Sequence, residues 1–154
     1  MTTANQSTPG AESAAEHAAD VVVIGGGPAG ENVAQYAHEG GLSAVIVEES
    51  LMGGDCSYYA CMPSKALLRP VEVAHTAAHL EGVDSPAVRV RELLARRDAW
   101  VSHYDDAGQV RWVEDAGLRV VRGRGEITGQ RTVRVTGPDG ERTLTARRAV
   151  VVAT

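Results

Sequence analysis

The stretch VVVIGGGPAGENVAQYAHEGGLSAVIVEE, residues 21–49, decides the fold. Val21–Ile24 is a β-branched run that is typical of a buried parallel strand. Ala29–His38 predicts a helix, and Ala44–Val47 predicts a second buried strand. Because a helical crossover joins two strands that run in the same direction, the segment predicts a βαβ unit and an α/β fold built on a parallel sheet.

The turn between the first strand and the helix has the spacing G-x-G-x-x-G, at Gly25, Gly27 and Gly30. In this pattern the first glycine permits a tight turn, the second lets a pyrophosphate approach the backbone, and the third lets the helix pack closely on the strand. Pro28 and Ala29 lie at the start of the helix, where free N–H groups and a partial positive charge favour an anion. The turn therefore predicts a Rossmann-like, dinucleotide-binding fold.

Glu48 stands at the end of the second strand, where a carboxylate can accept hydrogen bonds from both hydroxyls of a ribose. Strand alternation points its neighbour Glu49 elsewhere, which predicts a solvated charge. The unit predicts a dinucleotide site but does not distinguish FAD from NAD. The alternative is a glycine-rich turn that holds no ligand.

The two cysteines of the chain, Cys56 and Cys61, both lie in GGDCSYYACMPSK, residues 53–65. A zinc site is not expected there, because C-x4-C has no second pair of ligands nearby. His75 and His79 are spaced like ligands on a helix face, but no third ligand is evident, so we expect surface histidines and no metal.

Pro63 suits the first turn of a helix that we expect over Ser64–Leu80, which places Cys61 at or just before its N-terminus. Residues five apart in a regular helix point about 140° away from each other, whereas a disulfide needs Cα atoms roughly 4.4–6.8 Å apart. If the cysteines pair, the segment 58–60 must depart from a regular helix. The alternative is a pair of buried, small apolar residues.

Composition excludes several classes of function. The chain has 154 residues, 44% of them hydrophobic, which is typical of one soluble globular domain. Its net charge of −5 argues against a nucleic-acid partner, and no apolar stretch approaches the length of a membrane span. Residues 1–19 lack the basic start and apolar centre of a secretion signal, so we expect a disordered tail and a cytoplasmic protein. In that compartment a cysteine pair is more often redox-active than structural.

The remaining elements are expected to be scaffold. Helices are expected over Arg89–Asp105 and Gln109–Ala116, followed by a strand over Leu118–Val121. A β-hairpin that flanks the main sheet, turning at GPDG, and a last parallel strand complete the expected elements: Thr132–Thr136, Arg142–Ala146 and Ala149–Ala153.

Together, the glycine turn and the cysteine segment resemble the class I pyridine nucleotide–disulfide oxidoreductases, which include dihydrolipoamide dehydrogenase, glutathione reductase and mercuric reductase. That family has G-G-T-C-x-N-x-G-C-x-P-S-K, and this chain matches it at Gly53, Gly54, Cys56, Cys61, Pro63, Ser64 and Lys65. The closing AVVVAT, which ends at Thr154, is similar to the start of the family's second flavin motif. The resemblance spans Asp20–Thr154.

The resemblance implies FAD at the first βαβ unit, with NAD(P)H as co-substrate of the full-length enzyme. The cofactor-binding positions that it implies are the glycine turn, Glu48, Gly53, Gly54, Asp55, Lys65 and Thr154. It also implies an FAD-binding domain over residues 20–154 that stops before the NAD(P)H and dimerisation domains. We therefore expect an N-terminal fragment, inactive by itself, of an enzyme that is a homodimer when full length.

The resemblance also implies catalytic roles. Cys61 would be the charge-transfer thiol next to the flavin, Cys56 the interchange thiol that attacks a small-molecule or protein disulfide, and Lys65 a neighbour of the flavin ring. Asp55, Tyr58 and Ala60 depart from the family's Thr, Asn and Gly.

These departures leave the substrate open, and a charge at Asp55 should raise the pKa of the Cys56 thiol. Two alternatives remain: a non-catalytic flavin-binding module, and a flavoprotein oxidase or monooxygenase with incidental cysteines.

Overall fold

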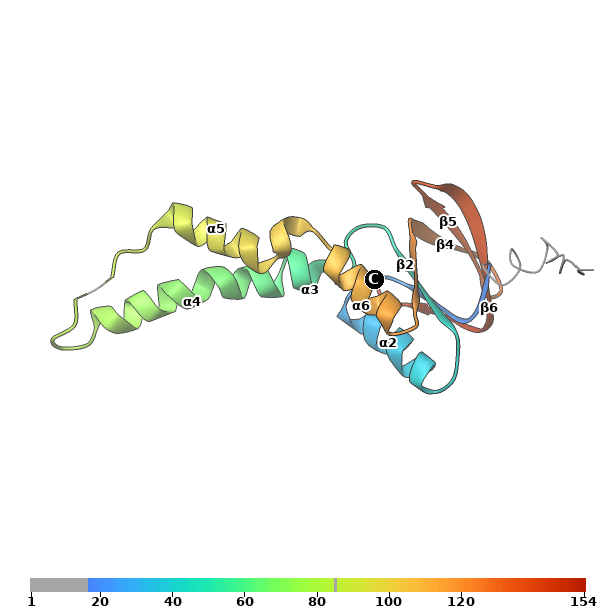
Figure 1. Ribbon diagram of the computed structural model, residues 1–154, viewed down its shortest axis with the longest axis horizontal. Helices are drawn as coiled ribbons and strands as arrows, with labels where there is room; N and C mark the ends of the chain where they lie inside the picture. Colours follow the sequence, from blue (N-terminus) through green and yellow to red (C-terminus); the bar gives the residue numbers. More distant parts are fainter. Residues whose placement is uncertain (1–16, 85) are drawn as a thin grey trace, which may run out of the picture.

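The structure is a computed structural model that describes residues 17–84 and 86–154. Its described part contains a six-stranded sheet with the order β3-β2-β1-β6-β5-β4 (Figure 1). The parallel part comprises four strands: β1 (Ala18–Ile24), β2 (Ala44–Glu48), β3 (Arg119–Arg122) and β6 (Gly140–Val152). Two strands extend the sheet in antiparallel fashion: β4 (Arg124–Gly129) and β5 (Thr132–Gly137). The predicted Rossmann-like α/β class is confirmed.

The carboxyl ends of the central strands meet at one edge of the sheet. Ile24, the last residue of β1, pairs with Val47 of β2 on one side and with Val152 of β6 on the other. The loops that follow these strands therefore emerge together, at the edge where the ligand sites of parallel α/β sheets lie.

The helices divide into two groups (Figure 1). The first group, α2 (Pro28–Glu39) and α6 (Ala107–Asp115), lies beside the sheet. The second extends away from it as a long arm made of α4 (Cys61–Ala78) and α5 (Val90–Trp100). The short helix α3 (Gly54–Tyr58) and the single turn η1 (Ser102–Tyr104) lie at the base of the arm.

Aliphatic side chains fill the core on both faces of the sheet, because the chain contains no Phe. On β1 the alternation is clear: Val22 and Ile24 pack with residues of β5 and β6, while Val21 and Val23 pack with residues of α2 and α6. The antiparallel strands thus cover one face and the helices cover the other.

The structure corrects the predicted hairpin. Its second strand and the last parallel strand are one continuous strand, β6, so the hairpin flanks the parallel strands as part of the same sheet. The Arg147–Arg148 pair looks like a break in the sequence, but Arg147 Nε donates to Asp20 Oδ1 at 2.9 Å, which holds that part of the strand beside β1. Strand β4 was not predicted, because RGEITG is glycine-rich and mostly exposed.

The bounds of several other elements also differ from the predicted ones. Strand β1 includes Ala18 and Ala19, which the sequence assigned to the tail, and Ala19 is fully buried. Residues 1–16 of that predicted tail lie outside the described residues. Helix α4 begins at Cys61 and runs through Pro70, and α5 ends at Trp100, before the predicted end at Asp105. Among the described helices, none has the length and apolar character needed to cross a membrane.

Candidate functional site

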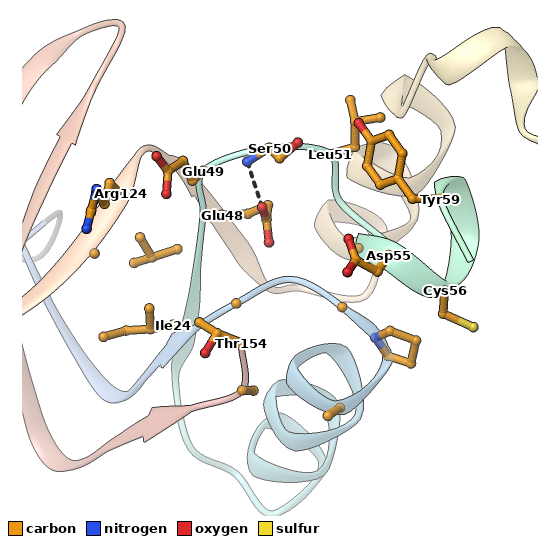
Figure 2. A pocket seen from close by; sticks show the side chains of 18 of the residues that line it. Ile24, Glu48, Glu49, Ser50, Leu51, Asp55, Cys56, Tyr59, Arg124 and Thr154 are labelled. Atoms are coloured by element: carbon orange, nitrogen blue, oxygen red, sulfur yellow. Dashed lines mark hydrogen bonds between the residues drawn. The ribbon is translucent and has the colours of Figure 1, made fainter. Parts of the chain in front are cut away.

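A cavity of about 720 Å³ opens at the carboxyl edge of the strands (Figure 2). Its walls come from the turn between β1 and α2, the end of β2 and the loop after it, α3, the start of β4 and the end of the chain. The predicted site residues that line it are Gly25, Gly27, Pro28, Ala29, Glu48, Gly54, Asp55, Cys56 and Thr154.

Two of the three glycines in the turn have the structural roles that the spacing predicts. Gly25 has a φ of 106°, and a side chain there would overlap the carbonyl of Ala153. Gly30 does not line the cavity, because it is buried at the start of α2, where a Cβ would overlap the carbonyl of Gly25. The first glycine therefore shapes the turn, and the third lets the helix pack against it.

The turn is joined to the cysteine segment. Gly53 donates its N–H to the carbonyl of Gly26 at 2.8 Å and is buried below the cavity wall. A Cβ on Gly54 would lie 2.7 Å from the Cα of Gly27. The two glycine-rich segments thus contact each other through their backbones.

Glu48 ties the loops around the cavity together. Its Oε2 accepts the N–H of Gly26 at 2.6 Å, and its Oε1 accepts the N–H of Ser50 at 2.6 Å, as Figure 2 shows for the second bond. A carboxylate has about four lone-pair sites, so both oxygens can still accept a hydrogen bond from a ligand in the cavity.

Two charged residues of the cavity wall were not assigned to the site by the sequence. Glu49 is exposed, as predicted for a solvated charge, but it also lines the cavity. Arg124, the first residue of β4, lies on the same side of the cavity in Figure 2. The sequence signal that could have identified Arg124 is its position between Gly123 and Gly125, shortly after a predicted strand.

The cysteines lie on either side of a break between two helices. Cys56 is in α3, Cys61 is the first residue of α4, and Ala60 between them has non-helical angles of φ −121° and ψ −84°. The predicted irregular segment is therefore present. Both cysteines are free thiols in the structure, Cys56 partly buried and Cys61 exposed.

The thiols interact with each other. A hydrogen bond with Cys61 raises the pKa of Cys56, partial burial adds to this, and the positive charge of Lys65 opposes it. The predicted direction is right but its cause is different, since the shift does not arise from Asp55. In Figure 2 the carboxylate of Asp55 points toward Glu48, whereas the sulfur of Cys56 points away from it.

Cys61 and Lys65 do not line this cavity. Lys65 is exposed on α4, close enough to act on Cys56 electrostatically. Its expected place beside a flavin ring stays a prediction.

A polar cluster that the sequence did not indicate supports the loop after β2. Asp106 Oδ2 accepts the N–H of Met52 at 2.6 Å and pairs with Arg122, which also donates to the carbonyl of Ser50. These contacts link the loop to the start of α6 and to the end of β3.

Two further groups lie under the same loop. Burial raises the pKa of Glu31, whose Oε1 accepts a hydrogen bond from Gln109 Nε2 at 2.7 Å. Burial also raises the pKa of Tyr58, and the nearby charge of Asp106 adds to the effect. The side chain that replaces the family's Asn therefore packs into the protein and does not face the cavity.

The cavity suits the adenosine and pyrophosphate parts of a dinucleotide. Gly27, the N-cap of α2, has no side chain, and the space that a Cβ would occupy there has no atom closer than 3.9 Å, so the helix N-terminus is open to an anion. Glu48 places a carboxylate at the end of β2 for a ribose. Asp55 is the feature that fits least well, because it adds negative charge to the wall.

Comparisons with known proteins identify relatives of this chain. The dihydrolipoyl dehydrogenase of Chlorobaculum tepidum is 36% identical over 138 residues, which cover 88% of this chain and 29% of that protein. The dihydrolipoyl dehydrogenase of Halobacterium salinarum is 36% identical over 126 residues, 79% of this chain and 26% of that protein. The chain thus spans less than a third of these relatives.

A solved structure has the same fold. The Cu(II) complex of RclA, an HOCl-induced flavoprotein disulfide reductase from Escherichia coli, matches 88% of this chain and 28% of its own with a TM-score of 0.72. Its sequence identity is 20%, so this likeness concerns the fold. The family model described as pyridine nucleotide-disulphide oxidoreductase matches residues 19–154. This chain therefore belongs to the pyridine nucleotide-disulphide oxidoreductase family.

Proposed function

We propose that the chain is the FAD-binding part of an enzyme that passes electrons between NAD(P)H, FAD and the Cys56–Cys61 pair, and from there to a disulfide substrate. The observation that carries the proposal is the junction of the dinucleotide turn with the cysteine segment, made by Gly27 and Gly54. The glycine turn contacts the segment that carries Cys56, and this arrangement suits a reaction that couples a dinucleotide with a dithiol. The names of the relatives support the same reaction class.

In this proposal the start of α2 and Glu48 would hold the pyrophosphate and a ribose of FAD, which supplies hydride acceptance and donation when bound. Cys56, as a thiolate, attacks one sulfur of the substrate disulfide and releases the other as a thiolate. Cys61 then attacks the Cys56 sulfur and releases the second substrate thiol. The cysteines lose two electrons to form a disulfide, and the substrate gains both.

The substrate is a small-molecule or protein disulfide, or a dithiol when the reaction runs in reverse. We also propose that the full-length enzyme is a homodimer with NAD(P)H and dimerisation domains after this one. The support is that the relatives are more than three times as long as the segments that match.

The test has two stages on the purified chain. FAD is titrated in while flavin fluorescence is followed, and we expect saturable quenching. The chain is then oxidised with glutathione disulfide, its thiols are counted, and bound FAD is photoreduced in the absence of oxygen with EDTA as the electron donor. We expect two thiols to disappear on oxidation and to return on photoreduction.

The first stage tests the cofactor, and the second tests whether the cysteines exchange electrons with it. Without saturable FAD binding, the cofactor assignment is wrong. If FAD binds but the thiol count does not respond to flavin reduction, the chain is a flavin-binding module, or part of an oxidase or monooxygenase with incidental cysteines.

A further inference from the structure

Three consecutive residues other than glycine adopt a left-handed backbone in the turn between α5 and α6. The angle φ is 51° at Ser102, 54° at His103 and 63° at Tyr104. This conformation costs roughly 1–2 kcal/mol for each residue that carries a Cβ. Such strain persists only where the surrounding structure imposes it, and strained residues cluster at functional sites.

Both ends of the turn are fixed. Val101, just before it, is 2% exposed and accepts the N–H of Tyr104 at 2.8 Å. Asp106, just after it, accepts the N–H of Met52 and pairs with Arg122. The protein therefore imposes the turn from the core on one side and from the polar cluster on the other.

The turn presents Tyr104 to the cysteine segment. Its ring stacks on the ring of Tyr59, with centroids 5.9 Å apart and planes at 29°. A stacked pair of this kind contributes about 0.5–1.5 kcal/mol beyond the area that it buries. Tyr59 is the C-cap of α3, and the residue after it, Ala60, is the break before α4.

We propose that Tyr104 is a positioning residue for the cysteine pair: its ring holds Tyr59, fixes the angle between α3 and α4, and so keeps the sulfurs of Cys56 and Cys61 together. The proposal rests on the dithiol role proposed above. It goes further because it assigns the geometry of the pair to a residue outside the cysteine motif.

The electrostatics of Cys56 provide a reporter for this geometry. Cys61 and Lys65 on α4, and Asp55 on α3, are the titratable groups around it, while the glycine turn packed against α3 offers none. The contact with Cys61 is the largest influence and raises the pKa of Cys56. If α3 moves away from α4, that pKa falls and alkylation of Cys56 speeds up at neutral pH.

The first measurement is the equilibrium constant for disulfide formation in glutathione buffers. Two protein thiols and one glutathione disulfide give the protein disulfide and two glutathione thiols, with two electrons passing to glutathione. We expect Tyr104→Ala and Tyr104→Leu to lower this constant at least ten-fold, and Tyr104→Phe, which keeps the ring, to stay within two-fold of the native chain. Tyr36→Ala, which removes an exposed ring on α2, is the matched control and should change nothing.

The second measurement is the pH profile of Cys56 alkylation by iodoacetamide, read from the modified peptide. We expect the profile of Tyr104→Ala to shift to lower pH, and that of Tyr104→Phe to coincide with the native profile. Native values for both truncations in both measurements would overturn the proposal. If the native chain forms no disulfide in any glutathione buffer, the dithiol role fails, whereas the alkylation profiles still decide whether Tyr104 sets the geometry.

Discussion

A side chain at Gly54 would collide with Gly27: a Cβ there would lie 2.7 Å from the Cα of Gly27. The two residues come from different motifs, one from the dinucleotide turn and one from the cysteine segment. Their backbone contact brings Cys56 to the wall of the cavity. The spacing of the glycine turn and Cys56 is therefore set where two backbones contact each other.

Replacing Gly54 with Ala should separate the two segments. Gly54 also has a φ of 60°, so the substitution adds strain to the collision. We expect a loss of stability of about 1–3 kcal/mol and a fall in FAD affinity of at least ten-fold, measured by urea unfolding and flavin fluorescence. Gly41→Ala is the matched control, because Gly41 has a φ of 80° and no neighbour within 4 Å of a Cβ. It should lower stability without lowering affinity, and equal affinity loss in both variants would contradict the explanation.

Glu48→Gln tests the carboxylate that joins the loops. The two carboxylate oxygens of Glu48 accept hydrogen bonds from the N–H groups of Gly26 and Ser50. The Gln amide has only one oxygen, so it can replace only one of these two acceptors. The other N–H would face an NH₂ group, at a cost of about 1–3 kcal/mol. We expect lower stability in urea and weaker FAD binding. Glu49→Gln is the control, because Glu49 lies on the same wall but is exposed, and it should leave stability unchanged. A loss of stability as large as that of Glu48→Gln would contradict the role of the two Glu48 hydrogen bonds.

Asp55→Thr restores the family's residue and removes a negative charge from the cavity wall. Because FAD carries a negatively charged pyrophosphate, we expect its affinity to rise several-fold. The gain should be larger at 0.05 M than at about 0.5 M salt, where charges are more strongly screened. Asp139→Thr, in the turn between β5 and β6, is the control and should not change affinity. A gain that does not depend on salt would point to shape instead of charge.

The ion pair between Asp106 and Arg122 should stabilise the loop after β2. Removing Asp106 leaves the N–H of Met52 without its acceptor and Arg122 without its partner. We expect Asp106→Ala to lower the free energy of unfolding by about 1–3 kcal/mol. A double-mutant cycle with Arg122→Ala should give a coupling energy of about 0.5–3 kcal/mol. Additive effects would mean that the two side chains act independently.

Stability should fall in acid because of Asp20. Hydrogen bonds from Arg147 and from Ser43 hold the pKa of Asp20 well below its usual range. Since this pKa is lower in the folded than in the unfolded chain, the contribution is complete above the unfolded value of about 3.9. It declines as the pH falls from there toward the folded pKa. We expect Asp20→Asn to be less stable than the native chain at pH 7, with a smaller difference at pH 3, both measured in urea. A difference that is constant with pH would exclude ionisation as the cause.

Local patterns predicted the parts of the site that lie close together in the chain. The glycine turn, Glu48 and the break at Ala60 follow from spacing within one unit of secondary structure. The polar cluster could not be predicted in this way, because Asp106 reaches Met52 across 54 positions and Arg122 reaches Ser50 across 72. Only the path of the chain through the sheet brings these residues together.

The same limit explains the errors in the sheet. A run of arginines in β6 resembles a loop until Asp20, 127 positions earlier, is placed beside it. Glu49 is exposed as predicted, but its place on the cavity wall could not be predicted, because the end of β2 was not fixed by the sequence.

The position of β6 has a consequence for biosynthesis. This strand occupies residues 140–152, and its partner in the middle of the sheet is β1, residues 18–24. During translation, β1 therefore leaves the ribosome long before its neighbour exists, with one edge open to other chains. Pairing between strands so distant in sequence is intrinsically slow, so the nascent chain passes through an aggregation-prone interval that a chaperone could shorten.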